Sequence, residues 1–325
     1  MSGQGVRDQA DGRVVLVLGG GPDAEHPVSV DSSRAVANAI NSGGQFAAEL
    51  RLFETLRLDE LRAMPGDVVF AVLHGPWGEG GPMQRLLEAD GRPFVGCGSV
   101  AARIAIDKIH TKQLALSLGI STGSASILHP LDDAPPIELP LVLKPVHEGS
   151  SVGLAICKNM DHWHAGVQQA RASLASGATA AFMVEPMTCG RELTVGVVAD
   201  EALPIVEIAP ADGVYDFAAK YARDDTRYIV DPPLPEGAAH AMQRDALRLA
   251  RAMGCAMLAR VDFMLDEQRG PVLLEANTMP GFTSHSLLPM AAARTGLGMP
   301  ALCGRLVEDA LDRHASHTTA RAAVR

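Results

Sequence analysis

The stretch LARVDFMLDEQRGPVLLEANTMPG, residues 258–281, decides the fold expected for this chain of 325 residues. Apolar residues flank a polar turn, which is typical of two antiparallel strands, predicted here at 256–266 and 271–277. A four-residue loop between the strands would pair Asp266 with Pro271. Every other pairing in the hairpin follows from that contact, because side chains alternate between the two faces of a sheet.

Four polar side chains fall on one face of this predicted hairpin. Counting back from the turn in steps of two places Asp262 opposite Glu275, and Arg260 opposite Asn277. Two facing carboxylates repel each other, so the sheet needs a compensating cation. Oxygen atoms of Asp262, Glu275 and Asn277 suit Mg²⁺, and Arg260 would face developing negative charge. The alternative is a solvated polar face in another register.

A loop rich in glycine and serine, HEGSSVG at 147–153, follows an apolar strand that ends at Lys144. Glycine and serine fill ordinary turns, so the loop alone is equally consistent with a flexible hairpin. The lysine at its base favours phosphate binding, because inward-pointing backbone N–H groups and one ammonium can hold phosphate oxygens. It is not a Walker A loop, which would lead from GxxxxGK[ST] into a helix.

Two N-terminal loops carry further candidates. Glu25 follows the turn GGGPDA at 19–24 and is expected at an amine site or as a helix-capping carboxylate. The absence of GxGxxG argues against a dinucleotide cofactor. His74 and Glu79 lie in HGPWGEGG, beyond a predicted parallel strand, at the edge where open α/β sheets bind ligands. A lone His or Glu in a loop is more often simply solvated.

A helix start in TSHSLLPMAA, residues 283–292, offers one more binding feature. Ser284 or Ser286 can cap it and leave N–H groups that attract a carboxylate. A plain N-cap is the alternative.

Composition limits the function classes. Five scattered cysteines without zinc-ligand spacing indicate a reduced, cytosolic protein. The net charge of −10 argues against broad nucleic-acid binding. A polar first dozen residues and the lack of an apolar run of about 18 residues predict neither a secretory signal nor a membrane span. We therefore expect a soluble cytoplasmic protein with a small ligand.

The order of strands and helices predicts an N-terminal α/β domain with a parallel sheet at 1–96, a central α+β domain at 97–184 and a C-terminal domain at 185–325. A long functional or disordered loop is expected at 209–235, and a frayed, disordered tail from about His314. The other predicted strands are 14–18, 47–53, 68–73, 124–128, 140–144, 153–157, 180–185, 192–199 and 204–208. The predicted helices are 29–40, 101–118, 161–175, 236–253 and 300–313.

Taken together, these stretches resemble the D-alanine–D-alanine ligases of the ATP-grasp superfamily. The likeness runs from about Val14 to Leu311 and is carried by GG...AEHPVS, LHGPWGEGG, DKIHTK, LVLKPVHEGSSVG, AKYARDDTRY, RVDFMLD and LLEANTMPGFTSHSLLPM. Each motif is short, but the ordered set is specific. The resemblance implies a three-domain ATP-grasp fold, with ATP between the central and C-terminal domains, and a cytoplasmic homodimer.

The resemblance also implies a reaction in two steps, which supplies D-alanyl-D-alanine for peptidoglycan precursors. The carboxylate of one D-alanine attacks the γ-phosphate of ATP, and the amine of a second D-alanine displaces phosphate from the acyl phosphate. Two Mg²⁺ ions, replaceable by Mn²⁺, would assist.

Site residues carry over motif by motif as expectations. The implied catalytic residues are Glu25, Ser150, Lys220 (transferred phosphate), Tyr221, and Arg260 with the Gly281 N–H at the oxyanion. The implied ATP contacts are Lys108, Lys144, Glu148, Gly149, Ser151, Glu185 (adenine), Pro186, Thr188 and Glu192 (ribose). The implied substrate contacts are Glu25 (first amine), Val28, His74, and Ser286 with the Leu287 N–H (second carboxylate). The implied metal ligands are Asp262, Glu275 and Asn277.

This chain departs from the usual family pattern at Gly80, at Ala102 and Arg103, at Ala219 and at Pro186. None of these positions is assigned to the chemistry, although they bear on the choice of second substrate and on the nucleotide pocket.

Three alternatives stay open. The second substrate could be D-lactate or D-serine, although Lys220 and Tyr221 favour the dipeptide. The chain could be a non-catalytic nucleotide-binding regulator, or a nicotinamide-dependent dehydrogenase.

Overall fold

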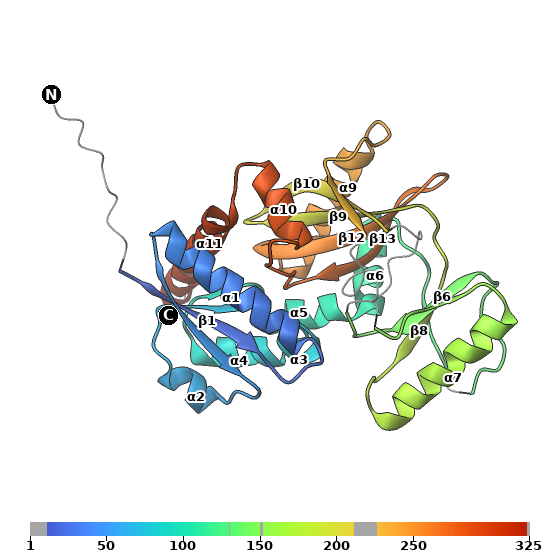
Figure 1. Cartoon of the computed structure of the whole chain (residues 1–325), viewed down its shortest axis with the longest axis horizontal. Helices are drawn as coiled ribbons and strands as arrows, with labels where there is room; N and C mark the ends of the chain where they lie inside the picture. Colours follow the sequence, from blue (N-terminus) through green and yellow to red (C-terminus); the bar gives the residue numbers. More distant parts are fainter. Residues whose placement is uncertain (1–11, 130, 150–151, 211–225, 324–325) are drawn as a thin grey trace.

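The chain forms three β-sheets with their own helices (Figure 1). This computed structural model describes residues 12–129, 131–149, 152–210 and 226–323. The predicted fold class is confirmed, because a parallel N-terminal sheet is followed by antiparallel sheets with helices packed on them. Within the described part of the chain, no helix combines the length and apolar character needed to cross a membrane.

The N-terminal sheet is parallel and covered by helices on both faces. Its elements, with the C-terminal helix that packs on it, are β1 (Val14–Gly20), α1 (His26–Gly43), β2 (Ala47–Phe53), α2 (Leu58–Ala63), β3 (Val68–Ala71), α3 (Pro76–Glu79), α4 (Pro82–Asp90), β4 (Phe94–Val95) and α11 (Met299–Ala323). The strand order is β2-β1-β3-β4. Val15 and Val17 share a buried cluster with α1 and α11, whereas Leu16 and Leu18 share one with α2 and α4. Burial on both faces explains the continuous apolar run VVLVL.

The central sheet is antiparallel, with strand order β5-β8-β6-β7. Its elements and the two helices before it are α5 (Ser99–Ile106), α6 (Lys108–Ser117), β5 (Ser126–Ile127), β6 (Leu141–Pro145), β7 (Ala155–Cys157), α7 (Met160–Ser176) and β8 (Phe182–Pro186). Fully buried Trp163 of α7 packs with Leu141, Leu143 and Val184 of the sheet. The predicted domain boundaries stay predictions, and the second one, at residue 185, falls inside β8.

The C-terminal sheet has one apolar and one polar face near its centre. Its elements are β9 (Arg191–Val198), β10 (Glu201–Ala209), β11 (Arg227–Val230), α9 (Ala238–Met253), β12 (Leu258–Asp266), β13 (Gly270–Asn277) and α10 (Leu287–Arg294), in the strand order β11-β10-β9-β12-β13. Val261 and Phe263 share a buried cluster with α9. Because side chains alternate along a strand, Arg260 and Asp262 of β12 lie on the opposite face.

The β12–β13 hairpin corrects one prediction and confirms another. Asp266 pairs with Gly270 instead of Pro271, so the predicted turn was wrong by one residue. The register then shifts between Asp262 and Phe263, and this bulge restores the predicted pairs Asp262–Glu275 and Arg260–Asn277. One extra residue on β13 therefore offsets the shorter turn.

The predicted helix at 101–118 is two helices, α5 and α6, which meet at Asp107. Asp107 has extended backbone angles, and its Oδ1 accepts hydrogen bonds from the N–H groups of Ile109 and His110 at 2.9 and 3.0 Å. It is therefore an N-cap in the middle of a sequence that looks continuously helical. The break makes Lys108 the first residue of α6.

Two other expectations were wrong in part. The predicted tail from His314 continues as helix α11 to Ala323. An i,i+4 ion pair between Asp309 and Arg313 stabilises the turn that precedes this extension. Within the predicted loop at 209–235, residues 227–230 form β11, which pairs with β10.

Candidate active site

Two adjoining cavities lie between the sheets. Cavity A, of about 340 Å³, is bounded by the N-terminal loops, the β12–β13 hairpin and the start of α10. Cavity B, of about 300 Å³, lies between the central and C-terminal sheets. Lys108, Glu148 and Glu275 line both cavities, so these three residues mark the junction.

Each predicted site residue within the described parts of the chain lines one of these cavities. Besides the junction residues, cavity A is lined by Glu25, Val28, His74, Gly149, Arg260, Asn277, Gly281, Ser286 and Leu287. Cavity B is lined by Lys144, Glu185, Pro186, Thr188, Glu192 and Asp262. Ser150, Ser151, Lys220 and Tyr221, and Ala219 beside them, lie outside the described residues.

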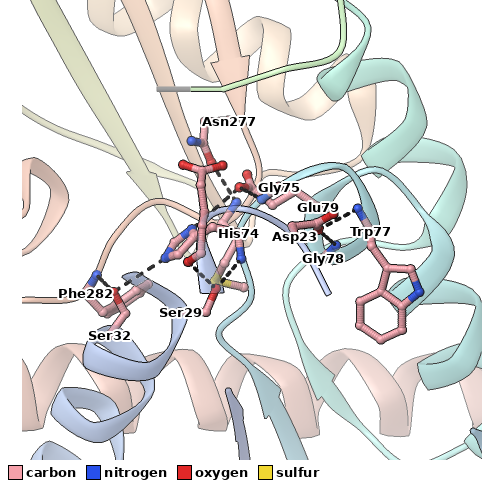
Figure 2. A network of polar contacts seen from close by, with 12 residues as sticks. Asp23, Ser29, Ser32, His74, Gly75, Trp77, Gly78, Glu79, Asn277 and Phe282 are labelled. Atoms are coloured by element: carbon pink, nitrogen blue, oxygen red, sulfur yellow. Dashed lines mark hydrogen bonds and ion pairs between the residues drawn. The ribbon is translucent and has the colours of Figure 1, made fainter. Parts of the chain in front are cut away.

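His74 is part of a buried polar network and not a solvated loop residue (Figure 2). Its backbone N–H donates to Ser29 Oγ at 3.0 Å, and its ring lies 3.5 Å from Ser32 Oγ on one side and from Glu79 Oε1 on the other. Glu79 Oε1 also accepts a hydrogen bond from the Gly75 N–H at 3.1 Å. These contacts fix the ring orientation at the wall of cavity A.

Asp23, which we did not predict as a site residue, ties two loops of this wall together. Its carboxylate accepts hydrogen bonds from the backbone N–H groups of Trp77 and Gly78 at 2.8 and 3.1 Å (Figure 2). Burial raises the pKa of Asp23, which outweighs the opposing effect of the two hydrogen bonds, and the nearby Glu25 raises it further.

The pKa of Asp23 predicts a pH dependence of stability. A carboxyl whose pKa is raised by folding contributes stability below its unfolded value, near 3.8, and this contribution is lost as the pH rises through the folded value. Asp23→Asn keeps an oxygen acceptor but cannot ionise. We therefore expect urea unfolding to show the variant gaining stability relative to wild type between pH 4 and pH 7. A relative loss over that range would contradict the assigned cause.

The N-terminal sheet and the glycine-rich loop meet at the junction. A β-carbon on Gly149 would lie 3.6 Å from Glu25 Oε2, so this carboxylate approaches the loop backbone closely. Lys108 Nζ donates to the Glu148 carbonyl at 2.6 Å and lies 3.3 Å from Glu275 Oε2. Lys108 therefore connects the loop to the β12–β13 hairpin.

Arg260 and Asp262 form a bidentate ion pair on the polar face of the C-terminal sheet. Arg260 Nε and Nη2 donate to the two carboxylate oxygens at 2.9 and 2.8 Å. Thr194 of β9, paired with Asp262 across the strands, donates its hydroxyl to Oδ1 at 2.5 Å. Such geometry holds both the guanidinium and the carboxylate in fixed directions.

The predicted metal ligands were tested against this geometry. Asp262 and Glu275 face each other as predicted, and Arg260 and Lys108 are the cations beside them, so the facing carboxylates by themselves do not require a metal. No cluster of three His, Cys, Asp or Glu side chains suited to a metal occurs among the described residues. Two carboxylates and the amide oxygen of Asn277, all lining the joined cavities, still fit Mg²⁺, which takes few protein ligands besides phosphate and water.

Ser286, and not Ser284, occupies the N-cap position of α10. Its hydroxyl makes no capping bond to the first turn and instead accepts from the Thr283 N–H at 3.0 Å. A β-carbon on Gly281 would lie 2.7 Å from Ser286 Oγ, so only glycine permits this approach. Both residues and the helix start face cavity A.

A buried triad of charges lies at the wall of cavity B. Glu185 Oε1 is 2.6 Å from Lys144 Nζ, and its Oε2 is 2.7 Å from Lys112 Nζ. Burial alone would raise the pKa of Glu185, but the two ammonium groups outweigh it and hold the pKa below its usual value. Burial likewise opposes the charge of Lys144, whose pKa is nevertheless raised by Glu185 and Glu275.

Sequence reasoning missed the polar residues Asp23, Lys112 and Thr194 because each acts through a neighbour on another element. It also missed the apolar lining of cavity B. That lining includes Val142, Val152, Leu154, Ile156, Met187, Met264 and Leu274. Alternation along the predicted strands could have placed several of these on the cavity face.

Comparisons with known proteins bear on these cavities. A family model described as D-ala D-ala ligase C-terminus matches residues 133–308. A D-alanine–D-alanine ligase of Bordetella petrii is 40% identical over 306 residues, which cover 91% of each chain. The solved structure of a ligase of that name from Coxiella burnetii aligns with a TM-score of 0.82 at 24% identity, over 97% of this chain and 98% of that one. One from Bacillus anthracis, complexed with ATP, aligns with a TM-score of 0.77 at 25% identity, over 94% and 99%.

Proposed function

The chain belongs to the D-alanine–D-alanine ligase family, and we propose that it joins two D-alanines in an ATP-dependent reaction that passes through an acyl phosphate. The observation that carries this proposal is the junction at Lys108, Glu148 and Glu275, where one cavity suited to a small amino acid adjoins another suited to a nucleotide. The dipeptide would supply bacterial cell-wall precursors.

Cavity B supports nucleotide binding. Its apolar side chains suit a purine ring, and Glu185 and Glu192 would bind adenine and ribose. Lys144 and Lys108 would then face the phosphates, with Lys108 at the entrance to cavity A. This order directs the terminal phosphate towards the amino acid.

Cavity A supports the binding of two amino acids. Glu25 would take the amine of the first D-alanine, near Val28 and the fixed ring of His74. Ser286 and the Leu287 N–H would take the carboxylate of the second, because an N-terminal turn of a helix favours an anion.

Arg260 and the N–H of Gly281 would face the oxyanion that forms when the second amine attacks. Arg260 is already oriented by its bidentate contact with Asp262, and such preorganised donors stabilise developing charge. Asp262, Glu275 and Asn277 would hold Mg²⁺, or Mn²⁺ in its place, which would neutralise phosphate charge. The roles of Ser150, Ser151, Lys220 and Tyr221 remain predictions from the family likeness.

We also propose a cytoplasmic homodimer. All five cysteines are free, and burial raises the pKa of Cys97 and Cys303 to about 12, which fits structural thiols in a reducing compartment. The dimer is proposed from the family alone.

The test is release of inorganic phosphate by the purified chain with ATP, Mg²⁺ and D-alanine. We expect phosphate to appear in step with D-alanyl-D-alanine, and D-serine or D-lactate with D-alanine to give less product. Phosphate release that does not respond to any D-amino acid would exclude the ligase. An absorbance titration with NADH tests the dehydrogenase alternative, and we expect no binding.

A further inference from the structure

Lys112 is a buried cation that cannot itself touch a ligand in either cavity. It lies in α6, one turn beyond Lys108, and is 3% exposed. Its Nζ donates to Glu185 at 2.7 Å and to Thr122 Oγ1 at 3.0 Å. It lines neither cavity A nor cavity B.

Lys144 binds the other oxygen of the same carboxylate but does line cavity B. A phosphate bound by its ammonium would compete with Glu185, which lies 2.6 Å from Lys144 Nζ and is only 5% exposed. A buried carboxylate without a cation is strongly disfavoured, so Glu185 would hold Lys144 back if it had no other partner.

Lys112 supplies that other partner. Its contact with Thr122 is itself anchored, because Thr122 Oγ1 donates to the Leu273 carbonyl of β13 at 2.8 Å. The charge of Lys112 also repels Lys144, and this repulsion weakens the net attraction between Lys144 and Glu185. Burial lowers the pKa of Lys112, so its position is kept at a desolvation cost that a purely structural apolar residue would avoid.

We infer that Lys112 is a positioning residue that compensates Glu185 while Lys144 turns to a nucleotide phosphate. This inference rests on the proposed ATP-dependent function. It assigns Lys112 an effect on phosphate binding and none on adenosine binding.

The test measures, by calorimetric titration of the full chain, the dissociation constants of adenosine and of a non-hydrolysable ATP analogue. The dissociation constant of adenosine divided by that of the analogue reports the contribution of the phosphates alone. In Lys112→Met we expect this ratio to fall about tenfold, which corresponds to the loss of one charge-assisted hydrogen bond. The affinity for adenosine should stay within about twofold of the wild-type value. Lys112→Gln, which keeps a donor to Thr122 without the charge, should show the same loss and serves if the Met variant does not fold.

A double variant separates positioning from simple structural damage. The Glu185→Gln background lacks the 2.6 Å ion pair with Lys144, so adding Lys112→Met should change the ratio by no more than about twofold. Lys158→Met, the same change at an exposed position, should leave the ratio unchanged.

Equal losses of adenosine and analogue affinity in Lys112→Met, or an unchanged ratio, would overturn the inference. A tenfold loss that persists in the Glu185→Gln background would also overturn it. If the wild-type chain did not bind the analogue more tightly than adenosine, the proposed ATP-dependent function itself would fail.

Discussion

In Glu275→Gln, we expect kcat for phosphate release to fall on the order of 10³-fold or more, while the fold is retained. The substitution keeps the size of the side chain but removes the charge that faces Asp262 across the hairpin and lies 3.3 Å from Lys108. Because Glu275 lines both cavities, this charge would act on the proposed phosphate and metal sites as well as on Lys108. Initial rates at saturating ATP, Mg²⁺ and D-alanine measure the effect.

Glu267→Gln is the matched control, because it makes the same change at the exposed turn of the same hairpin. Its kcat and its thermal midpoint should equal those of wild type. Circular dichroism should show that both variants are folded. Full activity in Glu275→Gln would remove the metal assignment and the junction from the mechanism.

In Arg260→Leu, we expect both a fall in kcat of about 10²–10³-fold and a loss of about 3–5 kcal/mol in the free energy of unfolding. The activity is lost because the guanidinium at the proposed oxyanion is absent. The stability is lost because Asp262, 6% exposed, keeps its charge without its bidentate partner. Steady-state kinetics and urea unfolding measure the two effects separately.

Two controls distinguish the two causes. Arg251→Leu breaks a pair with Asp200 of the same bidentate geometry at the surface, and should lower the free energy of unfolding far less than Arg260→Leu does. Adding Asp262→Asn to Arg260→Leu removes the unpaired charge, so stability should recover while activity should not. Recovery of activity in that double variant would contradict the role proposed for Arg260.

The hairpin shows how a correct site prediction can rest on an incorrect turn. The sequence places Asp262 opposite Glu275, although its actual loop is one residue shorter than predicted. The bulge on β13 makes up the difference. Ser121 and Thr122 bind the outer edge of β13 at Leu273. The Leu273 N–H donates to the Ser121 carbonyl, and Thr122 Oγ1 donates to the Leu273 carbonyl. A segment about 150 residues away therefore anchors the strand beside the bulge, which no local pattern could reveal.

The break at Asp107 has a similar origin. Residues 101–118 have the composition of one helix, and propensity alone predicts one. The chain bends because Asp107 caps α6 and because the Lys108 N–H donates to the carbonyl of Val146, directly after β6 of the central sheet, at 3.2 Å. Tertiary contact thus overrides a local preference and sets Lys108 at the junction.

The sequence by itself determined most of the strands, the parallel character of the N-terminal sheet, the antiparallel β12–β13 hairpin and the side chains available for chemistry. It could do so because alternation along strands and the residues at turns are local properties. Only the tertiary structure decided which cations compensate which carboxylates: Arg260 for Asp262, Lys108 for Glu275, and Lys112 with Lys144 for Glu185. These pairings depend on distance and burial between elements far apart in the chain, and Coulomb energies are set by both.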